Sequence, residues 1–217
     1  MPVSFNRGAL RRLTRILLCI LLGIPAVSHA ATSAEKAVGE VLVARMSLDR
    51  LRSYRVSVTL APGTVVVLTQ GATVLVEVVT PDRYRSVFKI AGLGTAESIT
   101  VGERTRSRAI GARSPARWEC KADDRPVQAL LPVIPAKPGD IGSITAFGET
   151  TIGGTRVRGF RYQRREGTRL STYRLYTLPA RGLPRRVEAF SAQGKPDVTA
   201  DYHDYNVPIS IKLPPCG

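Results

Sequence analysis

Apolar residues near the start of the chain recur at the spacing of an α-helix. Between positions 33 and 53 they step by three or four residues, at Ala37, Val41, Ala44, Leu48 and Leu51. This spacing places them on one face of an amphipathic helix. Ser33 is a suitable N-cap, and Glu35 would lie in the first turn. The pattern therefore predicts a helix over 33–53 whose apolar face packs against another element.

From Tyr54 onward the period changes to two, which is typical of half-buried β-strands. Short alternating or valine-rich segments follow one another, separated by Gly, Pro and other turn residues every eight to twelve positions. In the first half of the chain they span 54–60, 64–68, 73–79, 83–90, 97–101, 104–110 and 117–121. In the second half they span 143–152, 155–164, 168–178, 185–192 and 196–205. The pattern predicts an antiparallel meander in which about ten or eleven of these segments form strands.

The strand rhythm stops between positions 123 and 139, which hold four prolines. This segment also carries a compact apolar group, consisting of Val127, Leu130, Leu131, Val133 and Ile134. We expect a short helix that begins near Pro126 and ends at Pro132, because proline fits the first turn of a helix and interrupts its interior.

Many antiparallel strands with two helical pieces predict an α+β fold built on a large curved sheet with one covered face. Two short helices can cover part of such a sheet without filling the space at core density, which favours a lined cavity. A closed barrel or a two-sheet sandwich with a solid core is the alternative. The sequence contains no internal repeat and no linker, so residues 31–217 are expected to form a single domain.

The first thirty residues resemble a secretory signal peptide. Four arginines precede an apolar run over 16–24, and Ser28, His29 and Ala30 form a small-residue cleavage site. The run is too short to cross a bilayer, for which about 20 apolar residues are needed. We therefore expect cleavage near Ala30 and a periplasmic or secreted protein. A lipoprotein signal at Cys19 and twin-arginine export are alternatives.

The chain is strongly basic, with a net charge of +15. Removing residues 1–30 takes away four arginines and no acidic residue, which leaves 187 residues with a net charge of +11. For an exported protein this charge favours anionic phospholipids, lipopolysaccharide phosphates or acidic polymers over nucleic acid as partners. A solvated basic surface that only maintains solubility is the alternative.

Two cysteines, Cys120 and Cys216, remain after cleavage. An oxidising compartment favours their pairing, so we predict a disulfide that ties the C-terminus to the middle of the chain. Two free thiols are the alternative.

No motif of an enzyme or a cofactor site is present. His203 is the one histidine beyond the signal segment, so a Ser-His-Asp arrangement would require it, and the sequence has no G-x-S-x-G motif. It also has no H-E-x-x-H motif, cysteine cluster or phosphate-binding loop. Asp201 and His203 would share a strand face and could supply two metal ligands, although a plain surface pair explains them more simply. We therefore predict a protein that is not an enzyme, with no cofactor and no metal.

The order of these elements resembles a known family. A signal peptide and helix precede "TPDRYRSVFKIAG" and "ESITVGERTRSRAIGARSPARWEC", and a proline-rich connection precedes "ETTIGGTRVRGFRYQ". The end of the chain, "YTLPARGLPRRVEAFSAQGKPDVTADYHDYNVPISIKLP", contains a Gly182-Leu183-Pro184 approach to a strand. The succession is similar to that of the LolA-like superfamily, which includes periplasmic lipoprotein carriers, mycobacterial lipid-binding lipoproteins and the sensor domain of an envelope-stress regulator.

This resemblance implies an unclosed half-barrel of about 10–11 strands, with the N-terminal helix and the mid-chain helix packed into its concave side over a hydrophobic cavity. In the lipoprotein carriers an arginine on an early strand holds the lid, and Arg55 and Arg83 are the candidates here. The sequence departs from the superfamily pattern around Tyr176, where a tryptophan and an acid are often found.

A cavity of this kind would bind a lipid or acyl group, because each methylene removed from water contributes about 0.8 kcal/mol. The candidate lining residues are Val56, Val58, Leu60, Val65, Val67, Val74, Val76, Phe88 and Ile90, with Trp118, Leu130, Leu131 and Ile134 as a lid. An ordinary packed core would use the same residues.

Arginines at every second position would line one strand face and could contact an anionic surface. They are Arg83, Arg85, Arg104, Arg106 and Arg108. Arginines on a solvent-facing sheet also prevent aggregation, which is the alternative interpretation. The sequence thus predicts a cell-envelope protein that binds a lipid or acyl group for carriage or sensing. The alternative is a regulatory module of the same fold that binds an envelope protein partner.

Overall fold

The computed structural model describes residues 32–64, 71–111, 117–120, 134–166, 169–190 and 194–216. The predicted signal peptide, residues 65–68 of the predicted strand at 64–68, and the predicted helix at 126–132 lie outside these residues. Among the described residues, no helix is both long and apolar enough to cross a membrane.

The N-terminal helix, α2, spans Ser33–Asp49 and buries Ala37, Val41, Ala44 and Leu48, as the spacing predicted. Its N-cap is Thr32 rather than Ser33. The Glu35 N–H donates to Thr32 Oγ1 over 3.2 Å, and the Thr32 N–H donates to Glu35 Oε2 over 2.7 Å. This reciprocal pair is a capping box, which satisfies two otherwise free backbone donors and fixes the start of the helix. The helix ends at Asp49, four residues before the predicted end.

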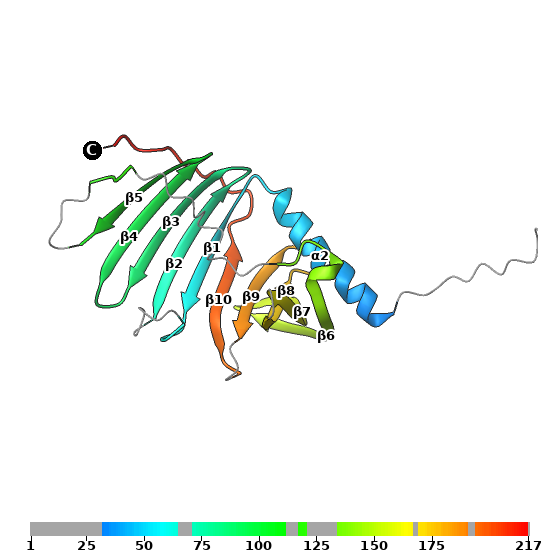
Figure 1. Cartoon of the computed structure of the whole chain (residues 1–217). Helices are drawn as coiled ribbons and strands as arrows, with labels where there is room; N and C mark the ends of the chain where they lie inside the picture. The colour runs from blue at the N-terminus through cyan, green and yellow to red at the C-terminus, as the bar shows by residue number, and fades with distance from the viewer. Residues whose placement is uncertain are drawn as a thin grey trace, which may run out of the picture. The chain divides into compact units, whose positions relative to one another are not determined.

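Within the described residues, ten antiparallel strands form one sheet (Figure 1). In chain order they are β1 (Ser53–Leu60), β2 (Ala72–Val79), β3 (Arg83–Ile90), β4 (Gly94–Val101), β5 (Arg104–Ile110), β6 (Ile141–Ile152), β7 (Thr155–Glu166), β8 (Arg169–Thr177), β9 (Pro184–Phe190) and β10 (Pro196–His203). The spatial order is β5-β4-β3-β2-β1-β10-β9-β8-β7-β6, so the first strand pairs with the last. The edges β5 and β6 do not pair with each other, and the sheet is an open, curved half-barrel, as expected. A 3-10 turn, η2, spans Pro138–Asp140 just before β6.

The predicted strand at 117–121 is wrong for the residues described. One isolated bridge joins Ser107 and Glu119, whose backbone groups exchange hydrogen bonds of 2.8 and 3.2 Å. This short segment therefore runs beside edge strand β5 without extending the sheet as a full strand.

The two faces of the sheet differ in chemistry. One, which we call the helix face, carries Tyr54, Val56, Val58 and Leu60 of β1 and packs against the buried side of α2. Cross-strand register continues this apolar surface, because Val56 faces Val76 on one side and Tyr202 on the other. The opposite face carries charged residues of β1 to β5 and is called the ion-pair face below. Strand alternation therefore separates an apolar side from a charged one.

Helix α2 contacts β6 and β9, and Figure 1 shows it lying across the half of the sheet that contains β6 to β9. Arg158 of β7 forms an ion pair of 3.1 Å with Glu40 of the helix. Beneath it, Tyr162 and Tyr173 stack with ring centroids 5.3 Å apart. The helix is thus attached to the second half of the sheet, and its apolar face is buried as the spacing predicted.

The Gly182-Leu183-Pro184 turn holds α2 close to the loop between β8 and β9. Gly182 has a φ of +62°, and a Cβ at this position would lie 2.9 Å from Val43 Cγ1 of the helix. Its N–H donates to the Leu178 carbonyl over 2.8 Å, and the Leu183 side chain is buried. The turn therefore needs a residue that accepts the left-handed region and has no side chain.

We expect Gly182→Ala to lower the free energy of unfolding by about 1–2 kcal/mol, because it combines left-handed strain with a close contact. Gly154→Ala is the matched control, since Gly154 has a φ of +78° and a Cβ added there would meet nothing within 4 Å. Urea denaturation of both variants measures the difference. Equal losses in the two variants would show that the approach of α2 contributes nothing.

The C-terminal segment is fastened at both ends. Near β10, Asn206 Oδ1 accepts from the Arg52 N–H over 2.8 Å, and Ser53 Oγ donates to the Val207 carbonyl over 2.6 Å. At the far end, Cys216 forms the predicted disulfide with Cys120, with their Cα atoms 5.8 Å apart. Figure 1 shows this segment running from the end of β10 to the β5 side of the sheet. The disulfide therefore attaches the last residues beside an edge strand.

Candidate functional site

A hollow of about 720 Å³ lies where β1 and β3 end and where β2 and β4 begin. The β1 end contributes Leu60, Ala61 and Pro62, and the turn after β3 contributes Ile90 and Ala91. The volume is in the range of small-molecule sites, about 300–1,000 Å³. The strand ends therefore form a mainly apolar site that is large enough for an organic ligand.

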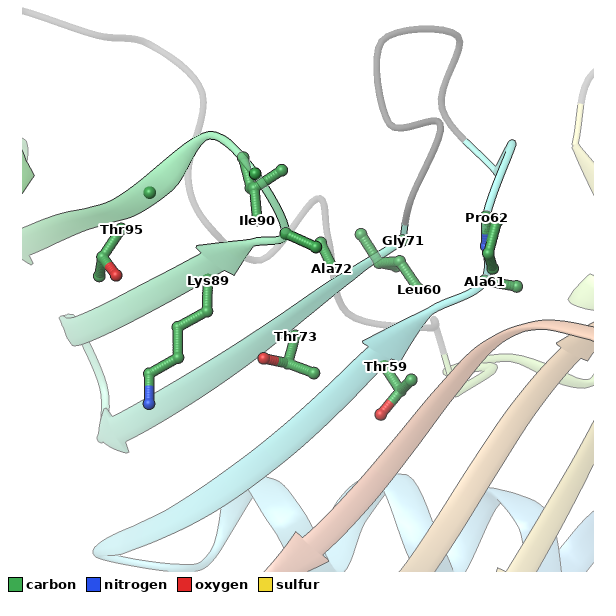
Figure 2. A pocket seen from close by; sticks show the side chains of 13 residues that line it. Thr59, Leu60, Ala61, Pro62, Gly71, Ala72, Thr73, Lys89, Ile90 and Thr95 are labelled. Carbon is green, nitrogen blue, oxygen red and sulfur yellow. The ribbon is translucent and has the colours of Figure 1, made fainter. Parts of the chain in front are cut away.

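Polar groups border this hollow on one side. Thr59, Thr73 and Lys89 occupy one cross-strand row of β1, β2 and β3, and Figure 2 shows their side chains around the site. Lys89 is exposed and supplies the positive charge of the lining. The hollow thus offers apolar surface for a hydrocarbon group next to one cation suited to a carboxylate or phosphate.

The residues predicted to line a cavity divide into two groups. Val56, Val58, Val74 and Val76 are at most 2% exposed and belong to the core on the helix face, as does Ile134. Leu60 and Ile90 lie at the hollow.

Phe88 is half-buried and packs against the core. Val65, Val67, Leu130 and Leu131 lie outside the described residues. The structure thus brings together two of the predicted lining residues at a site formed by strand ends.

Trp118 lies at the edge of the sheet on the ion-pair face. Its ring packs over the guanidinium of Arg108, with the Cζ atom 4.4 Å from the ring centroid. Such a contact combines cation–π attraction with shielding of the arginine stem. Trp118 is therefore not part of the hollow at the strand ends.

A ladder of alternating charges crosses five strands on the ion-pair face. Arg55 Nε lies 2.8 Å from Glu77 Oε1, and Glu77 Oε2 lies 3.1 Å from Arg85 Nη1. Arg85 Nε then lies 2.7 Å from Glu97 Oε1, and Glu97 Oε2 accepts from Arg108 Nε over 2.8 Å. These contacts join β1 to β5 across the full width of this half of the sheet.

Glu97 is the most buried member of the ladder, with a side chain 4% exposed. Burial alone would raise its pKa, but the hydrogen bonds from Arg85 and Arg108 outweigh burial and hold the pKa of Glu97 below its ordinary value. The carboxylate is therefore ionised at neutral pH and neutralises positive charge inside the sheet.

The five arginines predicted to contact an anionic surface have different surroundings. Arg85 and Arg108 are paired with Glu97, so much of their charge is compensated locally. Arg106 is half-buried and donates to the Thr105 carbonyl over 3.0 Å.

Arg83 and Arg104 are exposed and face the same residue of β4, Val101. Of the five arginines, Arg83 and Arg104 are therefore the main candidates for contact with an anionic surface. Of the two lid-arginine candidates, Arg55 is held by Glu77 and Asp204, whereas Arg83 is in this exposed pair.

Asp201 and His203 share one face of β10, as predicted, but each has another partner. Asp201 accepts from Arg186 Nε over 2.8 Å and from Nη2 over 3.0 Å. His203 contacts the side chains of Ser57 and Asp204. Within the described part of the chain, no three potential ligands gather into a metal site.

Sequence reasoning did not identify Lys89 as a lining residue or Glu77 and Glu97 as partners of the arginines. The available signal was that each glutamate stands inside an alternating strand segment, where a charge is expected on the polar face. The partners themselves depend on register, since Glu97 is opposite Val87 of β3 and Arg108 of β5.

Two proteins of known structure share this fold. LprF of Mycobacterium bovis aligns with a TM-score of 0.60 and 13% identity, over 86% of this chain and 100% of its own. Lipoprotein LppX of Mycobacterium tuberculosis aligns with a TM-score of 0.60 and 11% identity, over 82% of this chain and 98% of its own. The likeness confirms the fold that the resemblance to the LolA-like superfamily implied, and at these identities it shows the fold alone.

The LolA superfamily protein NE2245 of Nitrosomonas europaea aligns with a TM-score of 0.31 and 12% identity, over 85% of this chain and 96% of its own. No protein-family model and no curated protein matches the sequence.

Proposed function

We propose that the chain is an exported cell-envelope protein that binds a lipid or acyl group at the strand-end hollow, for carriage or sensing. The observation that carries this proposal is the apolar lining of the hollow with Lys89 at its border. An amphiphile with an anionic head fits this combination, because its hydrocarbon gains from leaving water and its head gains from the ammonium. The basic character of the chain also suits an anionic ligand.

The fold supports the same proposal. The resemblance to the LolA-like superfamily implied lipid binding, and the sheet is an open half-barrel of the kind that this resemblance implied. The hollow replaces the core valines as the proposed site, since Val56 and Val76 are fully buried. The exposed Arg83 and Arg104 are proposed to face the anionic membrane or lipopolysaccharide during delivery.

A bulky side chain inside the hollow should reduce ligand binding. Ala91 lines the hollow, whereas Leu93 in the same turn is 74% exposed and does not. We expect Ala91→Trp to weaken binding of a fluorescent fatty acid at least about tenfold, because the indole occupies the volume that the hydrocarbon would fill. Leu93→Trp is the matched control and should bind as the unmodified chain does. Fluorescence titration measures both.

Organic extraction of the purified protein, followed by lipid mass spectrometry, identifies the ligand. Lys89→Gln should weaken the binding of a fatty acid more than the binding of its methyl ester, since only the acid carries a charge. Recovery of no lipid, together with no uptake of the fluorescent fatty acid, would contradict the proposal. That outcome would favour the alternative, in which the same fold holds an envelope protein partner.

A further inference from the structure

A serine, a histidine and an aspartate lie in contact on the ion-pair face. Ser57 Oγ is 2.9 Å from His203 Nε2, and His203 Nδ1 is 3.1 Å from Asp204 Oδ2. Because the carboxylate faces Nδ1, that nitrogen carries the proton and Nε2 is left to accept from the serine hydroxyl. This is the order of contacts that activates a serine as a nucleophile.

The pairing of the first and last strands creates this group. Ser57 is in the middle of β1, and His203 is the last residue of β10, which pairs antiparallel with β1. In that register Ser57 is opposite Asp201 and Arg55 is opposite His203. The imidazole therefore reaches diagonally across the strand pair to the serine, although the two residues are 146 positions apart.

Asp204 is turned back onto the imidazole by an uncommon backbone conformation. Its φ is +53°, in the left-handed region that few residues other than glycine, asparagine and aspartate adopt. Its carboxylate also accepts from Arg55 Nη1 over 2.9 Å. Hydrogen bonds from Arg55 and His203 hold the pKa of Asp204 below its ordinary value. An ionised carboxylate thus orients the histidine.

Ser57 also lines a second hollow, of about 400 Å³, on the same face. Its apolar surface includes Leu75, which is directly opposite Ser57, and Val87, which is opposite Leu75. Lys89 borders this hollow as well as the larger one at the strand ends. A small acyl group can therefore lie on the two apolar side chains while its carbonyl carbon meets the serine.

We propose that Ser57 is a nucleophile that cleaves carboxylic esters of short, apolar acyl groups, with His203 as its general base and Asp204 as the residue that positions His203. Ser57 Oγ attacks the carbonyl carbon and gives its proton to His203 Nε2. The bond from that carbon to the alcohol oxygen breaks, and the leaving oxygen takes the proton from His203. Water then attacks the acyl-serine, gives a proton to His203, and releases the carboxylic acid as that proton returns to Ser57 Oγ.

The reaction should be slower than that of dedicated hydrolases. Ser57 lies within β1, whose backbone pairs with both β2 and β10, so two free backbone N–H groups do not form an oxyanion hole at this serine. Activated esters, whose leaving groups need less stabilisation, are therefore the appropriate substrates. This proposal does not depend on lipid binding at the larger hollow.

The test uses a fluorophosphonate probe, which phosphonylates activated serines with loss of fluoride, and hydrolysis of 4-nitrophenyl butyrate. We expect the label on Ser57, within the tryptic peptide 56–83, and no labelling of this peptide in Ser57→Ala. Ser143→Ala is the matched control, because Ser143 is an exposed serine of β6 that lines neither of the two hollows. This variant should be labelled on Ser57 and should hydrolyse 4-nitrophenyl butyrate as the unmodified chain does.

His203→Gln should lower ester hydrolysis by about 100-fold or more, since general-base catalysis contributes on the order of 10²–10⁴. Asp204→Asn should lower the rate of ester hydrolysis without unfolding the chain, because asparagine also tolerates the left-handed conformation. Thermal melting of each variant tests whether it is folded.

Absence of labelling on 56–83, or equal hydrolysis by the unmodified chain and by Ser57→Ala, would overturn the proposal. A rate that is independent of His203 would overturn it as well, even if Ser57 were labelled. Lipid extraction and fatty acid uptake are measured separately, so loss of this activity would leave the proposed binding function intact.

Discussion

Replacing Cys120 and Cys216 with serine should lower the free energy of unfolding by about 4 kcal/mol, the largest effect we expect from any change in this chain. The disulfide joins residues 96 positions apart, and a crosslink that closes so long a loop removes much of the conformational freedom of the unfolded chain. Urea denaturation of the double variant and of the oxidised parent chain, each fitted with its own m-value, measures the loss.

A reductant provides the internal control for this prediction. It should destabilise the parent chain by a similar amount and leave the double variant unchanged. Hydrogen exchange should increase toward residue 216, whereas the amides of Arg52 and Asn206 should stay protected, because they donate to Asn206 Oδ1 and to the Ser53 carbonyl. If the free energy of unfolding of the double variant were within about 1 kcal/mol of the parent value, the C-terminal contacts alone would hold the segment.

Glu97→Gln should lower the free energy of unfolding by about 3 kcal/mol, the second largest effect that we expect. The carboxylate is almost fully buried and accepts hydrogen bonds from Arg85 and Arg108. A glutamine of the same shape would remove the negative charge and turn an NH₂ group toward one of the two guanidinium groups. Removing one partner of a buried ion pair typically costs about 3–5 kcal/mol, and the partial exposure of both arginines favours the lower end. Glu103→Gln, at an exposed turn position, is the control and should change stability little.

The effect of Glu97→Gln should depend on pH. Because the folded pKa of Glu97 is below its ordinary value of 4.5, the ionised carboxylate contributes stability that is fully present above about pH 4.5. That contribution is lost as the pH falls through the lower, folded pKa. The difference in unfolding free energy between the parent chain and Glu97→Gln should therefore be constant from pH 7 to 5.5 and shrink below pH 4.5. A difference that stays constant down to pH 3 would contradict the role of the charge.

The periodicity of apolar residues was sufficient to predict the helix and most strands of the fold, because it indicates which side of each element is buried. Steps of three and four placed α2 and its buried face, and alternation placed Tyr84 and Ile90 on the opposite side from Arg83 and Arg85. Helix and strand ends were less well predicted, since caps and turns depend on local hydrogen bonds. The capping box at Thr32 and the loss of the strand at 117–121 are examples.

The candidate sites were predicted less completely. Leu60 and Ile90 were expected at a cavity and line the hollow, but Val56 and Val76, with the same pattern, are core residues. Alternation distinguishes the two faces of a strand and does not distinguish a packed position from an open one. That difference depends on which element covers the face at each point along the strand.

The sequence by itself determined that the chain forms an α+β protein with an amphipathic helix, many antiparallel strands and one Cys120–Cys216 pair. Each of these follows from local spacing or from residue chemistry. Only the tertiary structure decided that β1 pairs with β10, that Glu97 neutralises Arg85 and Arg108, and that Ser57 meets His203. The physical reason is that register between strands distant in the sequence is set by packing over the whole sheet, and contacts across strands exist only once that register is fixed.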